Sequence, residues 1–197
     1  MPHIAHLSKD KKFAKVLKNQ EKLKITKRKN VFINLVRSIV GQQLSTKAAE
    51  SIYQKFLLIY DGQAPTEEEL IRTPVELLRK AGLSYSKASY LKNIALFWQQ
   101  HQLSDKHFSK LSDDEIIALL TQIKGVGKWT VQMLLMFSLG REDIFSPDDL
   151  GIRKAMCQLY QLDENAKDLK KQMLALSEKW SPYRTYACLY LWKWRDK

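Results

Sequence analysis

The sequence has few of the features that mark secreted, membrane or metal-cluster proteins. Cys157 and Cys188 are its only cysteines, too few for a disulfide scaffold or a four-cysteine metal site. No apolar run approaches the roughly 18 residues that a membrane-spanning helix needs. The N-terminal segment lacks the apolar core of a secretory signal. These absences predict a cytosolic protein with reduced thiols and without a membrane-spanning segment.

Acidic residues are scarce relative to basic ones. The 197 residues include 21 Asp and Glu against 33 Lys and Arg, a formal net charge of +12. Such an excess favours a polyanionic partner, which can be DNA, RNA or a membrane surface. The basic run KLKITKRKN at residues 22–30 suits a solvated linker as well as a phosphate contact. Charge alone therefore does not choose the polyanion.

The apolar pattern is helical almost throughout. Hydrophobic residues make up 45% of the chain. Between residues 30 and 43, for example, apolar residues recur at the spacing of one face of a helix. Alternating strand patterns and internal repeats are missing, so the predicted fold is all-α with about ten to twelve helices. Caps and breakers predict further helices at 45–60, 85–100, 112–123 and 129–139, short helices opened by Pro65 and Pro74, and helix starts near Asp149, near Asn165 and at Ser181-Pro182.

The sharpest local signal is IKGVGKWTVQMLL at residues 123–135. Two glycines flank one apolar residue where one helix is expected to end and another to begin. Gly125 and Gly127 can take positive φ and let another backbone approach closely. The new helix presents N–H groups with partial positive charge, and Lys128 adds to it. Such a turn can hold a DNA phosphate without reading a base; the alternative is a tight turn between core helices.

Two adjacent aspartates follow about twenty residues later, in SPDDLGIRKA at residues 146–155. Alone, they are compatible with a pair of helix caps. In its wider context, however, this segment resembles part of the helix-hairpin-helix DNA glycosylase superfamily. The resemblance also rests on the hairpin, on IVGQQLSTKAAESIY (39–53) and on SPYRTYACLYLW (181–192). The likeness is greatest to the 3-methyladenine DNA glycosylase II branch, and it extends over residues 31–194.

The resemblance implies one glycosylase unit over residues 1–197, made of two small helical lobes with the active-site cleft between them. One lobe is expected at about 30–140, containing the hairpin at 123–130, and the other at about 1–29 plus 141–197. Many members of this branch carry an N-terminal β-rich lobe. Here the recognisable helices begin near Lys9, so a short form without that lobe is expected.

The implied activity is monofunctional hydrolysis of the N-glycosidic bond of alkylated purines, chiefly 3-methyladenine, in double-stranded DNA. The base is flipped out and an abasic site remains. Two alternatives stay open: a glycosylase for uracil, a mismatch or an oxidised base, and a non-catalytic DNA-binding protein that uses the same hairpin. A monomer is expected, associated with the nucleoid in a prokaryote or located in the nucleus of a eukaryote.

The family places its catalytic aspartate directly before a Leu-Gly pair, which implies that role for Asp149. A fixed carboxylate stabilises the oxocarbenium-like sugar that forms when the glycosidic bond breaks. A helix N-terminus favours the anionic form. Asp148 is then expected to be a helix cap or a supporting partner.

The resemblance also implies residues that handle the flipped base. Gln43 matches the position of the side chain that wedges between base pairs, with Gln42 as the second choice. Trp129 and Trp192 match pocket positions, where an aromatic face suits a cationic base. Tyr53 and Tyr186 are candidates for the same base pocket, although a core position is the favoured alternative for both.

Further implications concern phosphate, metals and lyase chemistry. Bifunctional relatives carry a Schiff-base lysine where this chain has Trp129, and Lys128 projects about 100° away on a helix, so lyase activity is not expected. Two cysteines exclude an iron–sulfur cluster, and the four histidines show no ligand spacing. The phosphate-binding residues are expected to be Gly125, Val126, Gly127, Lys128 and Thr130, and a monovalent cation is possible on the carbonyls of Thr121, Ile123 and Val126.

Overall fold

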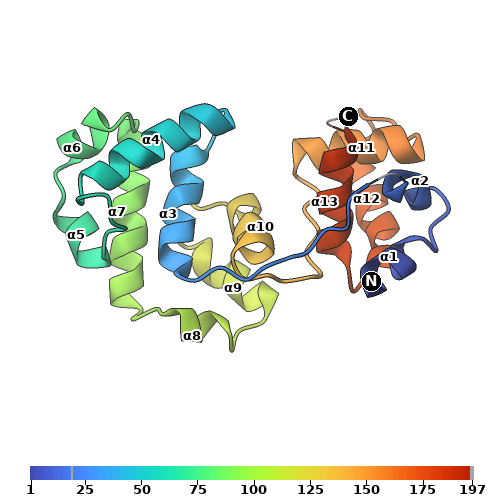
Figure 1. Ribbon diagram of the computed structural model, residues 1–197, viewed down its shortest axis with the longest axis horizontal. Coiled ribbons are helices and arrows are strands. Elements are labelled where there is room, and N and C mark those ends of the chain that lie inside the picture. The colour runs from blue at the N-terminus through green and yellow to red at the C-terminus, as the bar shows by residue number, and fades with distance from the viewer. Residues whose placement is uncertain (19, 196–197) are drawn as a thin grey trace. The chain divides into compact units, whose positions relative to one another are not determined.

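The computed structural model describes residues 1–18 and 20–195, and no strand occurs among them (Figure 1). The all-α prediction is confirmed. In this part of the chain, no helix is long and apolar enough to cross a membrane. The helices are α1 (Pro2–Leu7), α2 (Phe13–Leu17), α3 (Val31–Gly41), α4 (Thr46–Leu58), α5 (Glu67–Arg72), α6 (Val75–Lys80), α7 (Tyr85–Gln100), α8 (Asp105–Phe108), α9 (Asp113–Leu120), α10 (Lys128–Phe137), α11 (Leu150–Tyr160), α12 (Leu169–Ser177) and α13 (Arg184–Arg195), with a 3-10 helix η1 (Glu178–Trp180) before α13.

The chain divides into two compact units. The first consists of Met1–Lys27 and Leu135–Lys197, and the second of Arg28–Leu134. The boundary near Leu134 falls inside α10, whereas the sequence placed the boundary between the lobes at about residue 140, at Gly140. Each unit is described separately below.

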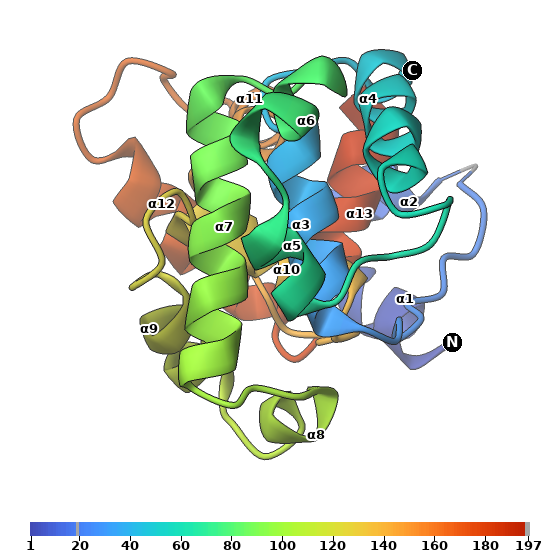
Figure 2. The same cartoon turned by 90° about the vertical axis from the view of Figure 1, so that its left-hand side faces the viewer.

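The Arg28–Leu134 unit is a helical bundle in which α7 packs against α3, α5 and α6 (Figure 2). The apolar face expected on residues 30–43 is the buried face of α3. Predicted caps start the helices: Ser45 accepts from Ala48 N at α4, and Ser112 forms a capping box with Glu115 at α9. The expected helix at 85–100 is α7, residue for residue.

In the other unit, α11 packs against α13 and the core centres on Trp180, which is fully buried. Its ring lies 5.0 Å from that of Phe13. The sequence placed the start of the last helix at Ser181-Pro182, and this was wrong: α13 begins at Arg184.

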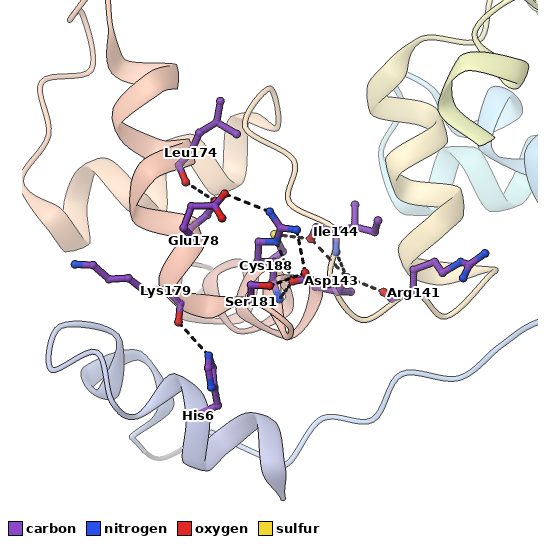
Figure 3. A network of polar contacts seen from close by, with 12 residues as sticks. His6, Arg141, Asp143, Ile144, Leu174, Glu178, Lys179, Ser181 and Cys188 are labelled. Carbon is purple, nitrogen blue, oxygen red and sulfur yellow. Dashed lines mark hydrogen bonds and ion pairs between the residues drawn. The ribbon is translucent and has the colours of Figure 1, made fainter. Parts of the chain in front are cut away.

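A carboxylate distant in sequence holds the chain where α13 begins. Asp143 accepts hydrogen bonds from the backbone N of Arg184 at 3.2 Å and from Ser181 Oγ at 2.8 Å. Figure 3 shows Ser181 turned toward Asp143. Two guanidinium nitrogens of Arg184 also donate to Asp143, at 2.8 and 2.9 Å. Asp143 therefore takes the part that the sequence gave to Ser181, and it ties α13 to the segment that leads to Asp149.

Candidate active site and DNA-contact elements

The predicted hairpin joins α9 to α10 and is held against α7. Gly125 has φ +101°, and a Cβ at this position would overlap the ring of Tyr90. Asn93 Nδ2 donates to the carbonyl of Lys124 at 3.2 Å. Gly125 is therefore required both for its backbone conformation and for the close approach of the tyrosine ring.

Gly127 does not share that conformation. Its φ is not positive, and a Cβ built there would meet nothing within 4 Å. The expectation of positive φ holds for Gly125 and not for Gly127. Instead, Gly127 exposes its backbone on an open surface just before α10, where the first helical hydrogen bond runs from Val131 N to Gly127 O at 3.2 Å.

The other phosphate-binding candidates differ in what they expose. Lys128 is exposed at the first position of α10. Val126 and Thr130 are only 4% and 3% exposed, so their side chains face the interior and only their backbone groups can serve a phosphate. The first N–H groups of a helix lack intrahelical acceptors, which makes the start of α10 suited to an anion.

The loop between α3 and α4 distinguishes the two glutamines. Gln42 Nε2 donates to Thr130 Oγ1 at 3.2 Å, so this side chain is engaged within the unit. Gln43 is exposed and has φ +57°, a left-handed conformation unusual outside glycine. Lys87 Nζ donates to the carbonyls of Val40 and Gln42, both at 2.8 Å. Of the two glutamines, Gln43 is therefore the one available to project.

Trp129 lies beside this loop. It is 41% exposed and lines a hollow of about 310 Å³. The residues around the hollow are Arg37, Ser38, Gly41, Gln42, Gln43, Leu44, Trp129, Thr130 and Met133. The structure thus brings together the predicted wedge, one predicted aromatic wall and the helix that follows the hairpin.

Tyr53 is not part of that hollow. It is 8% exposed and stacks on Phe56 with ring centroids 6.0 Å apart. The guanidinium of Arg37 covers its ring at 4.8 Å. Tyr53 is a core residue, as the alternative interpretation held.

Asp149 is the N-cap of α11. Its Oδ1 accepts a hydrogen bond from Ile152 N at 2.9 Å and another from Trp192 Nε1 at 2.8 Å. Gly151 makes room for this arrangement, because a Cβ there would lie 2.9 Å from Trp192 Cδ1. A backbone amide and an indole N–H therefore fix the orientation of the carboxylate.

Asp148 does not have the capping role proposed for it. Its two carboxylate oxygens accept from Lys170 Nζ at 2.7 and 2.8 Å, and the cap of α11 is its neighbour Asp149. The correction has a simple cause: Asp149 adopts the extended backbone of an N-cap, whereas Asp148 is exposed and pairs with Lys170 on α12.

Trp192 has a contact that the sequence did not indicate. Its ring stacks on Phe137 at 5.8 Å, while its N–H reaches Asp149. The base-pocket role remains a prediction, and the structure adds a positioning role. No local sequence signal indicates this contact, because Asp149 and Trp192 are far apart in the chain and meet only through the packing of α11 against α13.

Tyr186 is a core residue of this unit. It is 7% exposed and stacks on His3 with ring centroids 3.9 Å apart. Its hydroxyl donates to Glu142 Oε1 at 3.0 Å. Burial, followed by the bond to Glu142, raises the pKa of the phenol. The burial and the stacking on His3 agree with the core interpretation of Tyr186.

The described residues contain no group of three or more His, Cys, Asp or Glu side chains placed to hold a metal ion. Cys157 and Cys188 are both free thiols. Of the three carbonyls suggested for a monovalent cation, that of Ile123 accepts from Val126 N at 3.0 Å. A carbonyl can accept a second partner, and the cation stays a prediction.

A hairpin that offers backbone N–H groups, followed by a buttressed carboxylate at a helix start, defines a helix-hairpin-helix protein of the DNA-repair type. The chain belongs to the HhH-GPD superfamily of base excision DNA repair proteins, whose sequence model matches residues 36–182.

Individual relatives cover nearly the whole chain. This chain is 38% identical over 194 residues to DNA-3-methyladenine glycosylase 1 of Schizosaccharomyces pombe. The alignment covers 97% of this chain and 84% of that protein. The solved structure of the S. pombe 3-methyladenine DNA glycosylase Mag1 in complex with abasic DNA is similar at a TM-score of 0.87 and 37% identity, covering 98% of this chain and 96% of that one. The crystal structure of a DNA-3-methyladenine glycosidase from Bacillus halodurans is similar at a TM-score of 0.85 and 34% identity. The match covers 99% of this chain and 89% of that one.

Proposed function

We propose that this protein is a DNA glycosylase of base excision repair that hydrolyses the N-glycosidic bond of alkylated purines, chiefly 3-methyladenine, in double-stranded DNA. The observation that carries the proposal is the Asp149 carboxylate, held at the start of α11 by Ile152 N and Trp192 Nε1. The names and near-complete coverage of the relatives support the choice of substrate.

The carboxylate acts on the sugar. As the glycosidic bond breaks, the purine leaves with the bonding electron pair, and a fixed carboxylate stabilises the positive charge that develops on the deoxyribose. A water molecule then adds to the anomeric carbon and loses a proton, which leaves the abasic site. The two donors on Oδ1 hold the group in one orientation, so little reorganisation is needed during the reaction. An alkylated purine is already cationic and leaves readily, so the chemistry asks less of a general acid.

The Arg28–Leu134 unit holds the DNA by its phosphates. Gly127 and Lys128 offer N–H groups and positive charge to a phosphate, independently of sequence. Gln43 projects from the loop after α3 to occupy the space left by the flipped base. Trp129, exposed beside Gln43, offers an aromatic face suited to a cationic base.

The proposed enzyme is monofunctional. In bifunctional relatives a Schiff-base lysine occupies the position that is Trp129 here, directly before Thr130. Lys128 lies one residue earlier, about 100° around the helix. Borohydride reduction of the reaction mixture should therefore trap no covalent protein–DNA adduct, and a trapped adduct would refute this part of the proposal.

We also propose that no iron–sulfur cluster takes part, because such clusters are held by four cysteine thiolates and the chain has two cysteines. Iron and acid-labile sulfide measured on purified protein should both be near zero. Stoichiometric iron and sulfide would contradict this.

The function is tested by mass analysis of the bases released from methylated DNA, alongside a panel of duplexes that each carry one lesion. Release of 3-methyladenine well above release of uracil, mismatched or oxidised bases is the expected result. Preferred release of another base would move the protein to a different substrate. Tight DNA binding without release of any base would favour the non-catalytic alternative.

A further inference from the structure

One face of α7 supports both loops of the Arg28–Leu134 unit that are proposed to touch DNA. Lys87, Tyr90 and Asn93 are spaced three residues apart, which places them on one side of the helix. Tyr90 and Asn93 contact the hairpin at Gly125 and Lys124. Lys87 contacts the chain directly before Gln43, at the carbonyls of Val40 and Gln42.

The contact of Lys87 is unusually specific for a lysine. Its ammonium donates to the carbonyls of Val40 and Gln42 at 2.8 Å each, at the end of α3. The last carbonyls of a helix have no intrahelical donor and carry partial negative charge, so a cation there satisfies both needs. Lys87 is half-buried, so its side chain lies against protein, and this burial lowers its pKa.

The loop that Lys87 holds needs such support. Gln43 follows directly after one of the two carbonyls and has φ +57°, a conformation that residues other than glycine rarely adopt. It persists where the surrounding structure fixes the neighbouring backbone. Gln42 contributes by its side-chain bond to Thr130, and Lys87 contributes by clamping the main chain.

We propose that Lys87 is a positioning residue that fixes the backbone of residues 40–42, directly before Gln43, so that Gln43 is held ready to enter the base stack. This rests on the proposed function, because the wedge role of Gln43 is part of it. Lys87 itself need not touch DNA. Its replacement should therefore impair base flipping and leave the binding of undamaged DNA nearly unchanged.

Lys87→Met removes the charged donors and keeps the length of the side chain. Lys92→Met is the matched control: Lys92 is on the same helix and donates to the carbonyl of Ile71 at 2.6 Å, outside the loop of Gln43. We expect Lys87→Met to lower single-turnover base release by on the order of tenfold, with affinity for undamaged DNA within about twofold. Lys92→Met should match the wild type in both.

A double-mutant cycle separates positioning from general destabilisation. If Lys87 acts through Gln43, then Lys87→Met should cause little further loss once Gln43→Ala is present. An equal loss in both backgrounds would overturn the proposal, as would equal rates for the Lys87→Met and Lys92→Met proteins. Thermal melting of each variant identifies any that fail to fold, and Lys87→Gln, which keeps a neutral donor, replaces Lys87→Met in that event.

A second readout does not depend on base release. A 2-aminopurine placed next to the target base brightens when a side chain disrupts its stacking. The wild type and Lys92→Met should brighten it on binding, and Lys87→Met should not; equal brightening by all three would refute the positioning role. If the wild type releases no base at all, the glycosylase proposal fails, and this fluorescence still decides whether Lys87 controls the wedge.

Discussion

The indole of Trp192 offers the most informative perturbation of the carboxylate. Trp192→Phe removes the N–H that donates to Asp149 Oδ1 at 2.8 Å and keeps an aromatic ring to stack on Phe137. A hydrogen bond to a charged group is worth about 1.5–3 kcal/mol. If that contribution is lost mainly in the transition state, the rate of base release falls about 10- to 100-fold.

The assay is single-turnover release of 3-methyladenine at saturating protein, so that DNA affinity does not enter the rate. Gly151→Ala should reproduce part of the loss, because its Cβ would lie 3.0 Å from Trp192 Nε1 and displace the indole. Trp194→Phe, on the same helix, is the matched control and should react at the wild-type rate. A Trp192→Phe protein that folds and releases base at the wild-type rate would refute the buttressing of Asp149.

Four further substitutions test other parts of the molecule. Gly127→Ala should weaken DNA binding severalfold without lowering the melting temperature, since its Cβ meets only open space; Gly125→Ala should instead lower the melting temperature, because its Cβ would overlap a tyrosine ring. Gln43→Ala should slow base release with little change in binding to undamaged DNA, as measured by filter binding and single-turnover kinetics. Burial opposes ionisation of Asp143, but bonds from Arg184 and Ser181 outweigh it and hold the pKa of Asp143 below its usual value. The stability from this ion pair is therefore complete above about pH 4 and is lost as the pH falls through the lowered pKa. Asp143→Asn should flatten the pH dependence of urea-unfolding stability below about pH 4.

Much of the fold was predictable because its signals are local. Ser45 caps α4, and Ser112 with Glu115 forms a capping box at α9, as short-range patterns indicate. The hairpin is likewise visible in sequence, because GVG must fit between two helices. These features need only neighbouring residues, and that is the range over which single-sequence patterns carry information.

The missed features depend on residues far apart in the chain. Asp143 sets the start of α13 from a distant segment, and Tyr90 makes Gly125 necessary across the gap between α7 and the hairpin. Asp148 was expected to be a cap or a supporting partner because it stands beside Asp149, while its observed partner is Lys170 on another helix. The sequence could nominate Asp149, but only packing reveals Trp192 as the donor that orients it.

The central claim is that the negative charge of Asp149 stabilises the sugar cation while the glycosidic bond breaks, in addition to capping α11. Asp149→Asn keeps an oxygen that can accept from Ile152 N and Trp192 Nε1, so the cap and the fold should survive, and only the charge is removed. With methylated DNA bound to equal occupancy, mass analysis should detect 3-methyladenine released by the wild type and essentially none released by Asp149→Asn. Release at the wild-type rate by a folded, DNA-bound Asp149→Asn protein would contradict the claim.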